Sequence, residues 1–200
     1  MVNFSKLIKR LSPYIFLILF TLQTSSWTDD ITDFQIEEMS VGDSLLDYIT
    51  EKEIKNKPKY IYENNKFIAI IISKPSFEFY ENVQIVYESS NKKIHSLEAM
   101  IDYEKNIKDC YNKKDEIVSE LTEFFKDKVK IWSQNNVKYQ GDKSGKSKFS
   151  AVNFDFDIGG SARVICYDFE EKISIENGWP DTLTVSINSI EFDKYLSTPK

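Results

Sequence analysis

The chain has 200 residues, of which 41% are hydrophobic, and it holds only six glycines and five prolines; this composition argues against a disordered chain. The formal net charge of −6 disfavours nucleic acid and anionic lipid as partners, because both would be repelled. Lysines outnumber arginines 24 to 2, a bias that we attribute to an AT-rich genome and not to a binding surface.

The first 26 residues predict a secretory signal peptide that is removed on export. A basic start, an apolar run and two small residues follow one another, namely Lys6, Lys9 and Arg10, then Tyr14 to Leu22, then Thr24 and Ser26. The apolar run is about half of the roughly 20 residues that a spanning helix needs, which makes an uncleaved anchor the weaker alternative. We therefore expect an exported protein, periplasmic or secreted, without a stable membrane span after cleavage.

Residues 27–39 are acidic and predict a loose lead-in, with a short extended piece near Phe34 to Ile36. A single domain over residues 40–197 is expected to follow. Two short helices should open it, the first capped by Asp43, and the second by Thr50, which has Glu53 at the capping-box spacing.

Residues 59–103 predict antiparallel strands. The segments "KYIYE" and "KFIAIIIS" flank a turn at Asn64-Asn65, and "NVQIVYE" and "IHSLEAMIDY" flank "SSNK". In the last segment Leu97, Ala99 and Ile101 share one face by the two-residue period, and His95 has the same parity.

The clearest helix is expected over residues 105–128, because apolar residues recur there at intervals of three and four. A polar stretch, residues 133–148, is interpreted as a loop. Three strands then follow, "AVNFDFD", "ARVICYDF" and "LTVSINSIEF", as an antiparallel meander. The order predicts an α+β fold with helices on one face of a largely antiparallel sheet. A three-residue loop at the first hairpin of the meander would place Arg163 opposite Asp155 or Asp157.

The only cysteines, Cys110 and Cys166, predict one disulfide in an exported protein. Cys110 lies on the apolar face of the expected long helix, and Cys166 lies on the core face of its strand. Two buried free thiols are the alternative.

The stretch "GDKSGKS", residues 141–147, resembles a phosphate-binding loop but fails its requirements. Three residues, not four, separate Gly141 from Gly145, and an alternating strand follows where the motif needs a helix. We interpret the stretch as a solvated connection. Alternatively, Lys143, Lys146 and Lys148 form a basic spot that contacts an anionic partner.

The inventory of catalytic side chains is thin. His95 is the only histidine, which excludes multi-histidine metal sites, and no nucleophile-elbow sequence occurs. We expect no catalytic, cofactor or metal residues. Asp155 and Asp157 could act as paired carboxylates, although simple strand alternation also explains them. Trp132 and Trp179 could stack on a sugar, although such residues more often close the edge of a core.

Five segments, "MSVGDSLLDYITEKEIK", "NIKDCYNKKDEIVSEL", "DKSGKS", "VICYDF" and "VSINSIEF", resemble blocks of a family of small exported proteins from AT-rich marine bacteria. The similarity runs over most of residues 34–196. The resemblance implies export and makes "DKSGKS" a family turn, but it implies no activity and transfers no catalytic residue. The element order alone is also similar to the beta-lactamase-inhibitor-protein-like fold.

These observations favour a non-enzymatic exported envelope protein that binds a partner protein or a small ligand. A carboxylate-dependent hydrolase of the cell envelope is the alternative, and a purely structural role comes third.

Overall fold

The computed structural model describes residues 31, 34–104 and 106–198. The signal peptide predicted for residues 1–26 lies outside the described residues. The strands are β1 Gln35–Ile36, β2 Met39–Ser40, β3 Tyr60–Ile61, β4 Phe67–Ile72, β5 Asn82–Glu88, β6 Ile94–Glu104, β7 Val129–Lys138, β8 Lys148–Phe156, β9 Ser161–Asp168 and β10 Asp181–Asn188. The helices are α2 Glu51–Asn56, α3 Ile107–Phe125, α4 Glu171–Asn177 and α5 Ile190–Ser197, with short 3-10 turns η2 Leu45–Asp47, η3 Glu63–Asn65 and η4 Lys126–Lys128.

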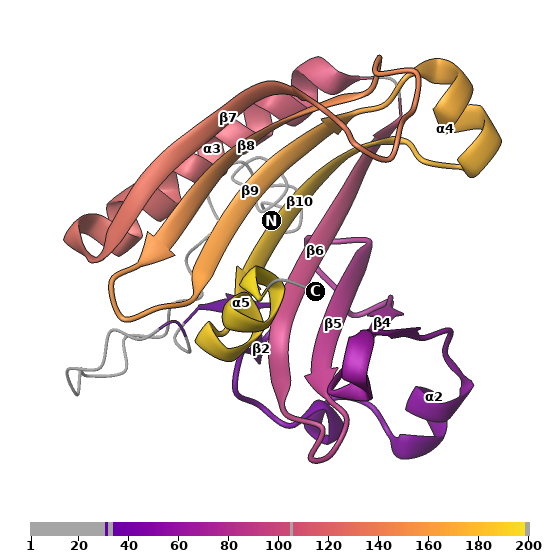
Figure 1. Ribbon diagram of the computed structural model, residues 1–200, viewed down its shortest axis with the longest axis vertical. Coiled ribbons are helices and arrows are strands. Elements are labelled where there is room, and N and C mark those ends of the chain that lie inside the picture. The colour runs from indigo at the N-terminus through magenta and orange to yellow at the C-terminus, as the bar shows by residue number, and fades with distance from the viewer. Residues whose placement is uncertain (1–30, 32–33, 105, 199–200) are drawn as a thin grey trace, which may run out of the picture.

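The expected α+β class is confirmed (Figure 1). Among the described residues, eight strands form one antiparallel sheet in the order β3-β4-β5-β6-β10-β9-β8-β7, and β1 pairs with β2 separately. The last strand, β10, pairs with β6 and so joins the earlier strands to the later ones, with Val185 opposite Ala99 and Ile187 opposite Leu97.

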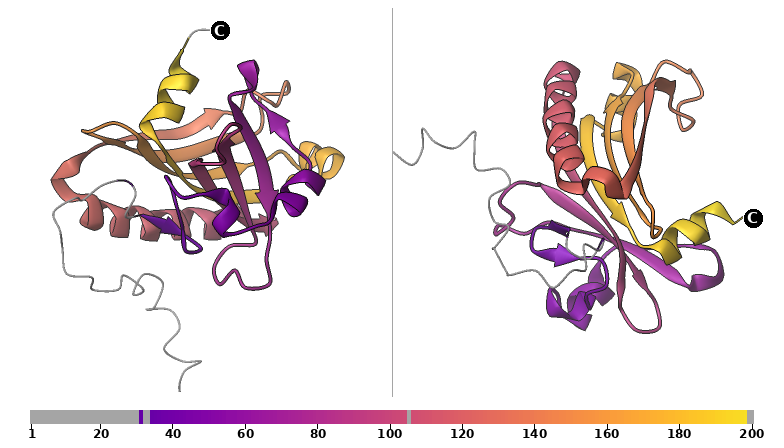
Figure 2. Two further views of the ribbon diagram at one scale, coloured as in Figure 1. Left: turned by 90° about the horizontal axis from the view of Figure 1, so that it is seen from below. Right: turned by 90° about the vertical axis from the view of Figure 1, so that its left-hand side faces the viewer.

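One face of the large sheet is covered by α3 and by the N-terminal elements (Figure 2). Cys110, Ile117 and Leu121 of α3 lie in the same buried cluster as Val164 and Cys166 of β9. The N-terminal residues of this cluster, which pack over β4 and β5, include Ile36, Met39, Leu45 and Ile54. The amphipathic pattern of residues 105–128 therefore predicted the helix and its buried side correctly.

Cys110 of α3 and Cys166 of β9 form a disulfide, with their Cα atoms 6.0 Å apart. Both residues are fully buried. The bond closes a loop between residues 56 positions apart, and it fastens the long helix to the centre of the sheet.

The capping box at Thr50 is confirmed: the Thr50 hydroxyl accepts from the Glu53 amide at 3.3 Å, and the Glu53 carboxylate accepts from the Thr50 amide at 2.7 Å. The predicted cap of the first short helix was wrong. Ser44 caps it, while the Asp43 carboxylate accepts hydrogen bonds from the Ser40 amide and the Tyr48 hydroxyl.

The described part of residues 27–39, expected as a loose lead-in, belongs to the core. Ile36 is 2% exposed and Met39 is 1% exposed, and Phe34 packs on Phe125 with ring centroids 6.0 Å apart. Three buried apolar side chains outweigh the acidic composition of the segment.

The end of the chain also differs from expectation. The stretch 133–148 was expected to be a loop, but residues 133–138 belong to the edge strand β7. This strand adds a fourth strand to the predicted meander. "LTVSINSIEF" is a strand only to Asn188, because Ser189 caps α5 by accepting from the Phe192 amide. The β8–β9 hairpin has Arg163 opposite Asn153, so the predicted pairing with Asp155 or Asp157 was wrong.

None of the helices in the described part of the chain is both long and apolar enough to cross a membrane.

Candidate functional site

The second face of the large sheet is open over its middle. Helix α5 lies on this face at one end, where Phe192 packs on Phe67, Ala69 and Val86 (Figure 1). Between α5 and α4, no described helix or strand crosses the face (Figure 1). Side chains of β5, β6, β10, β9, β8 and β7 point outward there, because alternate residues of each strand fill the covered core.

Polar side chains near α5 are bonded to one another. Ser96 donates to the Asn188 side chain at 2.6 Å, Asn188 donates to Ser161 at 3.3 Å, and Ser161 donates to the Asp193 carboxylate of α5 at 3.1 Å. These hydrogen bonds pair the polar side chains of this face that lie next to α5.

The next row across the sheet is different, and we call it the polar row. It follows directly from the strand registers and consists of Gln84, Glu98, Ser186, Arg163, Asn153 and Trp132, one residue from each of β5, β6, β10, β9, β8 and β7. Within the described chain, the side chains of Gln84, Glu98 and Ser186 have no hydrogen-bond partner. The row therefore presents unused donors and acceptors side by side.

Arg163 lies at the centre of the polar row and is the only arginine among the described residues. Its guanidinium lies 5.4 Å from the ring centroid of Phe149, and its Nη2 donates to the Gln134 side chain at 3.0 Å. Its buried Nε has no hydrogen-bond partner in the described structure. Two contacts thus hold the group in place, and its Nε is shielded from solvent, so a ligand would be recognised through the terminal nitrogens of the guanidinium.

Glu98 is two strands away from Arg163, with Ser186 between them, which places their Cα atoms about 10 Å apart. Glu98 is half-buried, and no ion pair within 4.0 Å joins it to a described residue. Burial raises the pKa of the Glu98 carboxyl, and the charge of Arg163 opposes this shift only in part. The partly buried Glu98 carboxyl thus has no bonded partner among the described residues, which leaves it as a candidate contact for a ligand.

Tyr167 lies on the same face of β9 as Arg163, two rows from the polar row and beyond the row of Ile165. Burial raises the pKa of its hydroxyl to about 12, and the nearby charge of Glu98 acts in the same direction. Tyr167 also belongs to an aromatic cluster at the end of the face away from α5, formed with Phe149, Phe169, Tyr139 and Trp179. The rings of Tyr167 and Phe169 are stacked 5.6 Å apart. The hydroxyl is therefore neutral and fixed near the two charged groups.

Trp132 closes the polar row at edge strand β7. Its indole Nε1 donates to the Asp155 carboxylate at 2.8 Å, and the residue is 41% exposed. This bond fixes the indole on the open face. Trp179, the other tryptophan considered for sugar stacking, lies instead in the aromatic cluster with Tyr139, so the two do not form one spot.

Asp155 and Asp157 are not brought together as a catalytic pair. Asp155 is an exposed residue of β8 and is bonded to Trp132, while Asp157 is exposed in the turn after β8.

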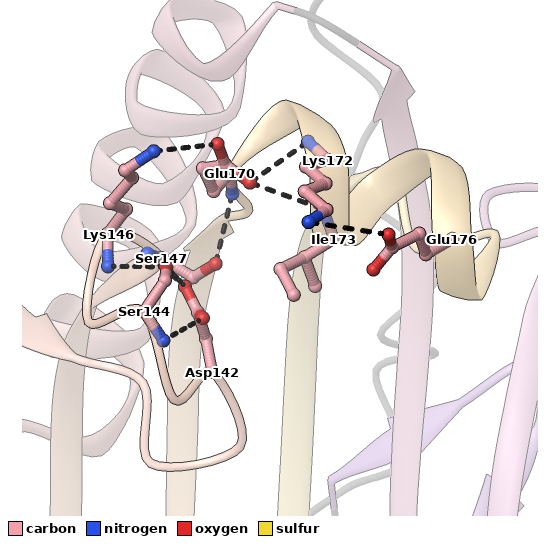
Figure 3. Close-up of polar contacts among 8 residues, drawn as sticks. All are labelled: Asp142, Ser144, Lys146, Ser147, Glu170, Lys172, Ile173 and Glu176. Carbon is pink, nitrogen blue, oxygen red and sulfur yellow. Dashed lines mark hydrogen bonds and ion pairs between the residues drawn. The ribbon is translucent and has the colours of Figure 1, made fainter.

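The loop that contains "GDKSGKS" joins β7 to β8 and is a closed turn (Figure 3). The Asp142 carboxylate accepts from the amide of Ser144 at 2.7 Å, from its hydroxyl at 2.8 Å and from the amide of Ser147 at 2.8 Å. These hydrogen bonds hold the pKa of Asp142 well below its usual range. The side chain of Asp142 thus occupies the amide donors that a phosphate would use, which agrees with the rejection of a nucleotide-binding role.

The same loop is tied to α4. Ser147 accepts from the Glu170 amide at 3.0 Å, and Lys146 pairs with the Glu170 carboxylate at 3.1 Å (Figure 3). Glu170 also caps α4 through the amides of Lys172 and Ile173. Of the three lysines considered for partner contact, Lys146 therefore has a structural partner, whereas Lys143 and Lys148 are exposed.

His95 is buried at 4% exposure, as a structural residue. A register shift in the β5–β6 ladder moves it off the face of Leu97, so the parity predicted for it was wrong. Its ring packs on Phe67, and its Nδ1 lies 2.8 Å from the hydroxyl of Ser189, which caps α5. Burial lowers the pKa of His95, so the ring is neutral and helps to hold α5.

Among the described residues, no group of three or more histidine, cysteine or acidic side chains is arranged to hold a metal ion. Comparison with known proteins found no matching family model, no matching curated protein and no matching solved structure.

Proposed function

We propose that this protein is a non-enzymatic, exported envelope protein that binds its ligand on the open face of the large sheet, at the polar row. One observation carries the proposal. Glu98 and Arg163 lie in one row on an uncovered face; Glu98 has no hydrogen-bond partner among the described residues, and Arg163 is bonded only to Gln134 and has an unbonded Nε. The unpaired side chains of Gln84, Glu98 and Ser186 keep contact with solvent, so together with Arg163 they form a row of groups that a ligand could pair.

Export is part of the proposal and is supported by the disulfide. Disulfides persist in oxidising compartments and are rare in the cytosol. The acidic chain and its signal-like start, together with the resemblance to small exported proteins, point in the same direction.

The test compares capture by variants that retain the fold. The purified protein is immobilised and exposed to an extract of the cell envelope, separated into low-mass and macromolecular fractions. We expect one component to be retained by the wild type and by Lys148→Ala, and to be lost with Arg163→Lys and with Glu98→Gln. Thermal unfolding of each variant shows whether the fold is intact.

Three results would overturn the proposal. Retention that is equal in all four proteins would place binding elsewhere on the surface. Loss in Lys148→Ala alone would move the contact to the basic spot of the β7–β8 loop. Failure to retain any component would also count against it.

The hydrolase alternative has less structural support. It needs two carboxylates within about 5 to 9 Å of each other across one substrate bond. Asp155 is engaged by Trp132, and Asp102 accepts from the Thr182 hydroxyl at 3.1 Å. Glu98 therefore lacks a second free carboxylate in its own row.

A further inference from the structure

We propose that the ligand of the polar row is a neutral oligosaccharide, a proposal that rests on the binding function proposed above and names its ligand class. Three features of the face support a neutral oligosaccharide: its near-zero net charge, its mixture of hydrogen-bond donors and acceptors, and its aromatic rings.

The charges of the open face nearly cancel. Four rows cross the centre of this face: the polar row, the row under α5 and the two rows toward α4. Their basic side chains are Lys130 and Arg163, and their acidic side chains are Asp102, Asp155 and Glu98. Three of these charges are already engaged or balanced locally: Asp155 is bonded to Trp132 and lies opposite Lys130, and Asp102 is bonded to Thr182. A face of this kind gives no net attraction to an anion or a cation, and it therefore favours an uncharged ligand.

The unpaired groups require a ligand that donates and accepts at close spacing. Arg163 can only donate, an ionised Glu98 can only accept, and Ser186, Gln84 and Asn153 can do both. Sugar hydroxyls meet this requirement because each one is a donor and an acceptor. A hydrocarbon would leave Arg163 and Glu98 unsatisfied, which would cost affinity.

Aromatic rings lie in or near the row in two places. Trp132 is exposed at the β7 end, and its indole is fixed by Asp155. The rings of Tyr167 and Phe149, 6.1 Å apart, lie two rows from the polar row, and the Arg163 guanidinium lies 5.4 Å from the ring centroid of Phe149. Flat apolar surfaces beside planar polar groups suit a pyranose, whose faces are apolar and whose rim is polar. The row from Trp132 to Glu98 crosses four strand spacings, roughly 19 Å, which suits several linked rings better than one.

The experiment titrates the purified protein with neutral β-1,4-linked oligomers of glucose and of N-acetylglucosamine, from dimer to hexamer, and follows tryptophan fluorescence and heat. We expect saturable binding to one series, with affinity that rises with oligomer length and then levels off. Arg163→Lys and Trp132→Ala should each weaken binding about tenfold or more, because each removes a contact to the ligand. Lys148→Ala, which is outside the row, should leave affinity unchanged.

Acidic oligosaccharides and short peptides serve as competitors of different chemistry. If no neutral oligomer binds, or if an acidic oligomer or a peptide binds more tightly and depends on Arg163, the inference is wrong. The face-dependent capture of an envelope component would then still stand, so the two failures are distinguishable. Release of shorter oligomers during the titration would instead show an enzyme and contradict both proposals.

Discussion

The two faces of the large sheet use the same strands in opposite ways. The covered face is filled by apolar side chains from α3 and the N-terminal elements, and the disulfide lies within it. The open face carries Glu98 and Arg163 without full pairing. Stability should therefore be concentrated on the first face, and binding on the second.

On the open face, the pairing of polar side chains differs between the region next to α5 and the polar row. Under α5, Ser96, Asn188 and Ser161 are linked in one hydrogen-bonded chain. One row further from the helix, Arg163, Asn153 and Trp132 are bonded, whereas Gln84, Glu98 and Ser186 have no hydrogen-bond partner in the described structure. Where α5 covers the sheet, the first three side chains are bonded to one another, although the buried Nε2 of His95 there has no partner among the described residues, so the contrast with the polar row is one of degree.

The largest expected effect is on the covered face. Replacing both cysteines, Cys110→Ser and Cys166→Ser, should lower the free energy of unfolding by about 4 kcal/mol, because the bond limits the unfolded chain over a long loop. Urea unfolding of the variant and of the wild type measures the difference. Reduction of the wild type should give a similar loss, and a wild-type protein with two free thiols under denaturing, non-reducing conditions would refute the disulfide.

A cavity in the covered face should lower the free energy of unfolding somewhat less than loss of the disulfide does. Leu121 is 2% exposed on the sheet side of α3, so Leu121→Ala is expected to lower the free energy of unfolding by about 3 kcal/mol. The matched control lies on the open face: Ile71, at the β4 end of the row that contains Glu98, is 50% exposed, and Ile71→Ala should cost less than about 1 kcal/mol. Similar losses at the two positions would remove the contrast between the faces.

The elements whose signals are local could be predicted from the sequence. The capping box of Thr50 and the apolar stripe of α3 each depend on residues a few positions apart. Cys110 and Cys166 could be paired because each lies on the apolar side of a periodic segment.

The rest depends on contacts that no local pattern encodes. Strand β7 is polar on both sides because it lies at the edge of the sheet, so it lacks the alternation of a half-buried strand. In "LTVSINSIEF" the apolar alternation continues through Ser189, and the cap that starts α5 is supported by His95 from another strand.

The polar row was missed for the same reason. Its members are brought into line by the pairing of β10 with β6, across more than eighty residues of chain, and each one alone is an ordinary outward-facing strand residue. The single usable signal was Arg163, one of only two arginines in a chain with 24 lysines. Its isolation was attributed to genome composition, which explains the abundance of lysine but not the choice of arginine at this position.

The β7–β8 loop offers a smaller test, since it borders the open face without belonging to the polar row. Asp142→Asn should lower the unfolding temperature at neutral pH, because one oxygen and an amide replace the carboxylate that accepts from Ser144 and Ser147. The folded-state pKa of Asp142 is lowered, so its contribution is complete above the unfolded value of about 3.9 and is lost as the pH falls toward the folded value. The difference between wild type and variant should therefore shrink in strong acid. Asp157→Asn, in an exposed turn, is the control, and an equal effect there would show that the hydrogen bonds of Asp142 do not matter.

The smallest effect should have the opposite sign. Glu98→Gln is expected to raise the free energy of unfolding at neutral pH, by about 1 kcal/mol or less, because glutamine removes a charge that the fold buries without a partner. Burial raises the folded-state pKa of Glu98, so the penalty is absent at a pH below the unfolded pKa and is complete above the folded pKa. The variant should therefore match the wild type in acid and exceed it as the pH rises, with Glu81→Gln, an exposed residue before β5, showing no such trend. A loss of stability in Glu98→Gln at neutral pH would mean that the carboxylate is paired within the protein. The polar row would then be satisfied by the chain itself, and the contrast between the two faces would no longer point to a ligand.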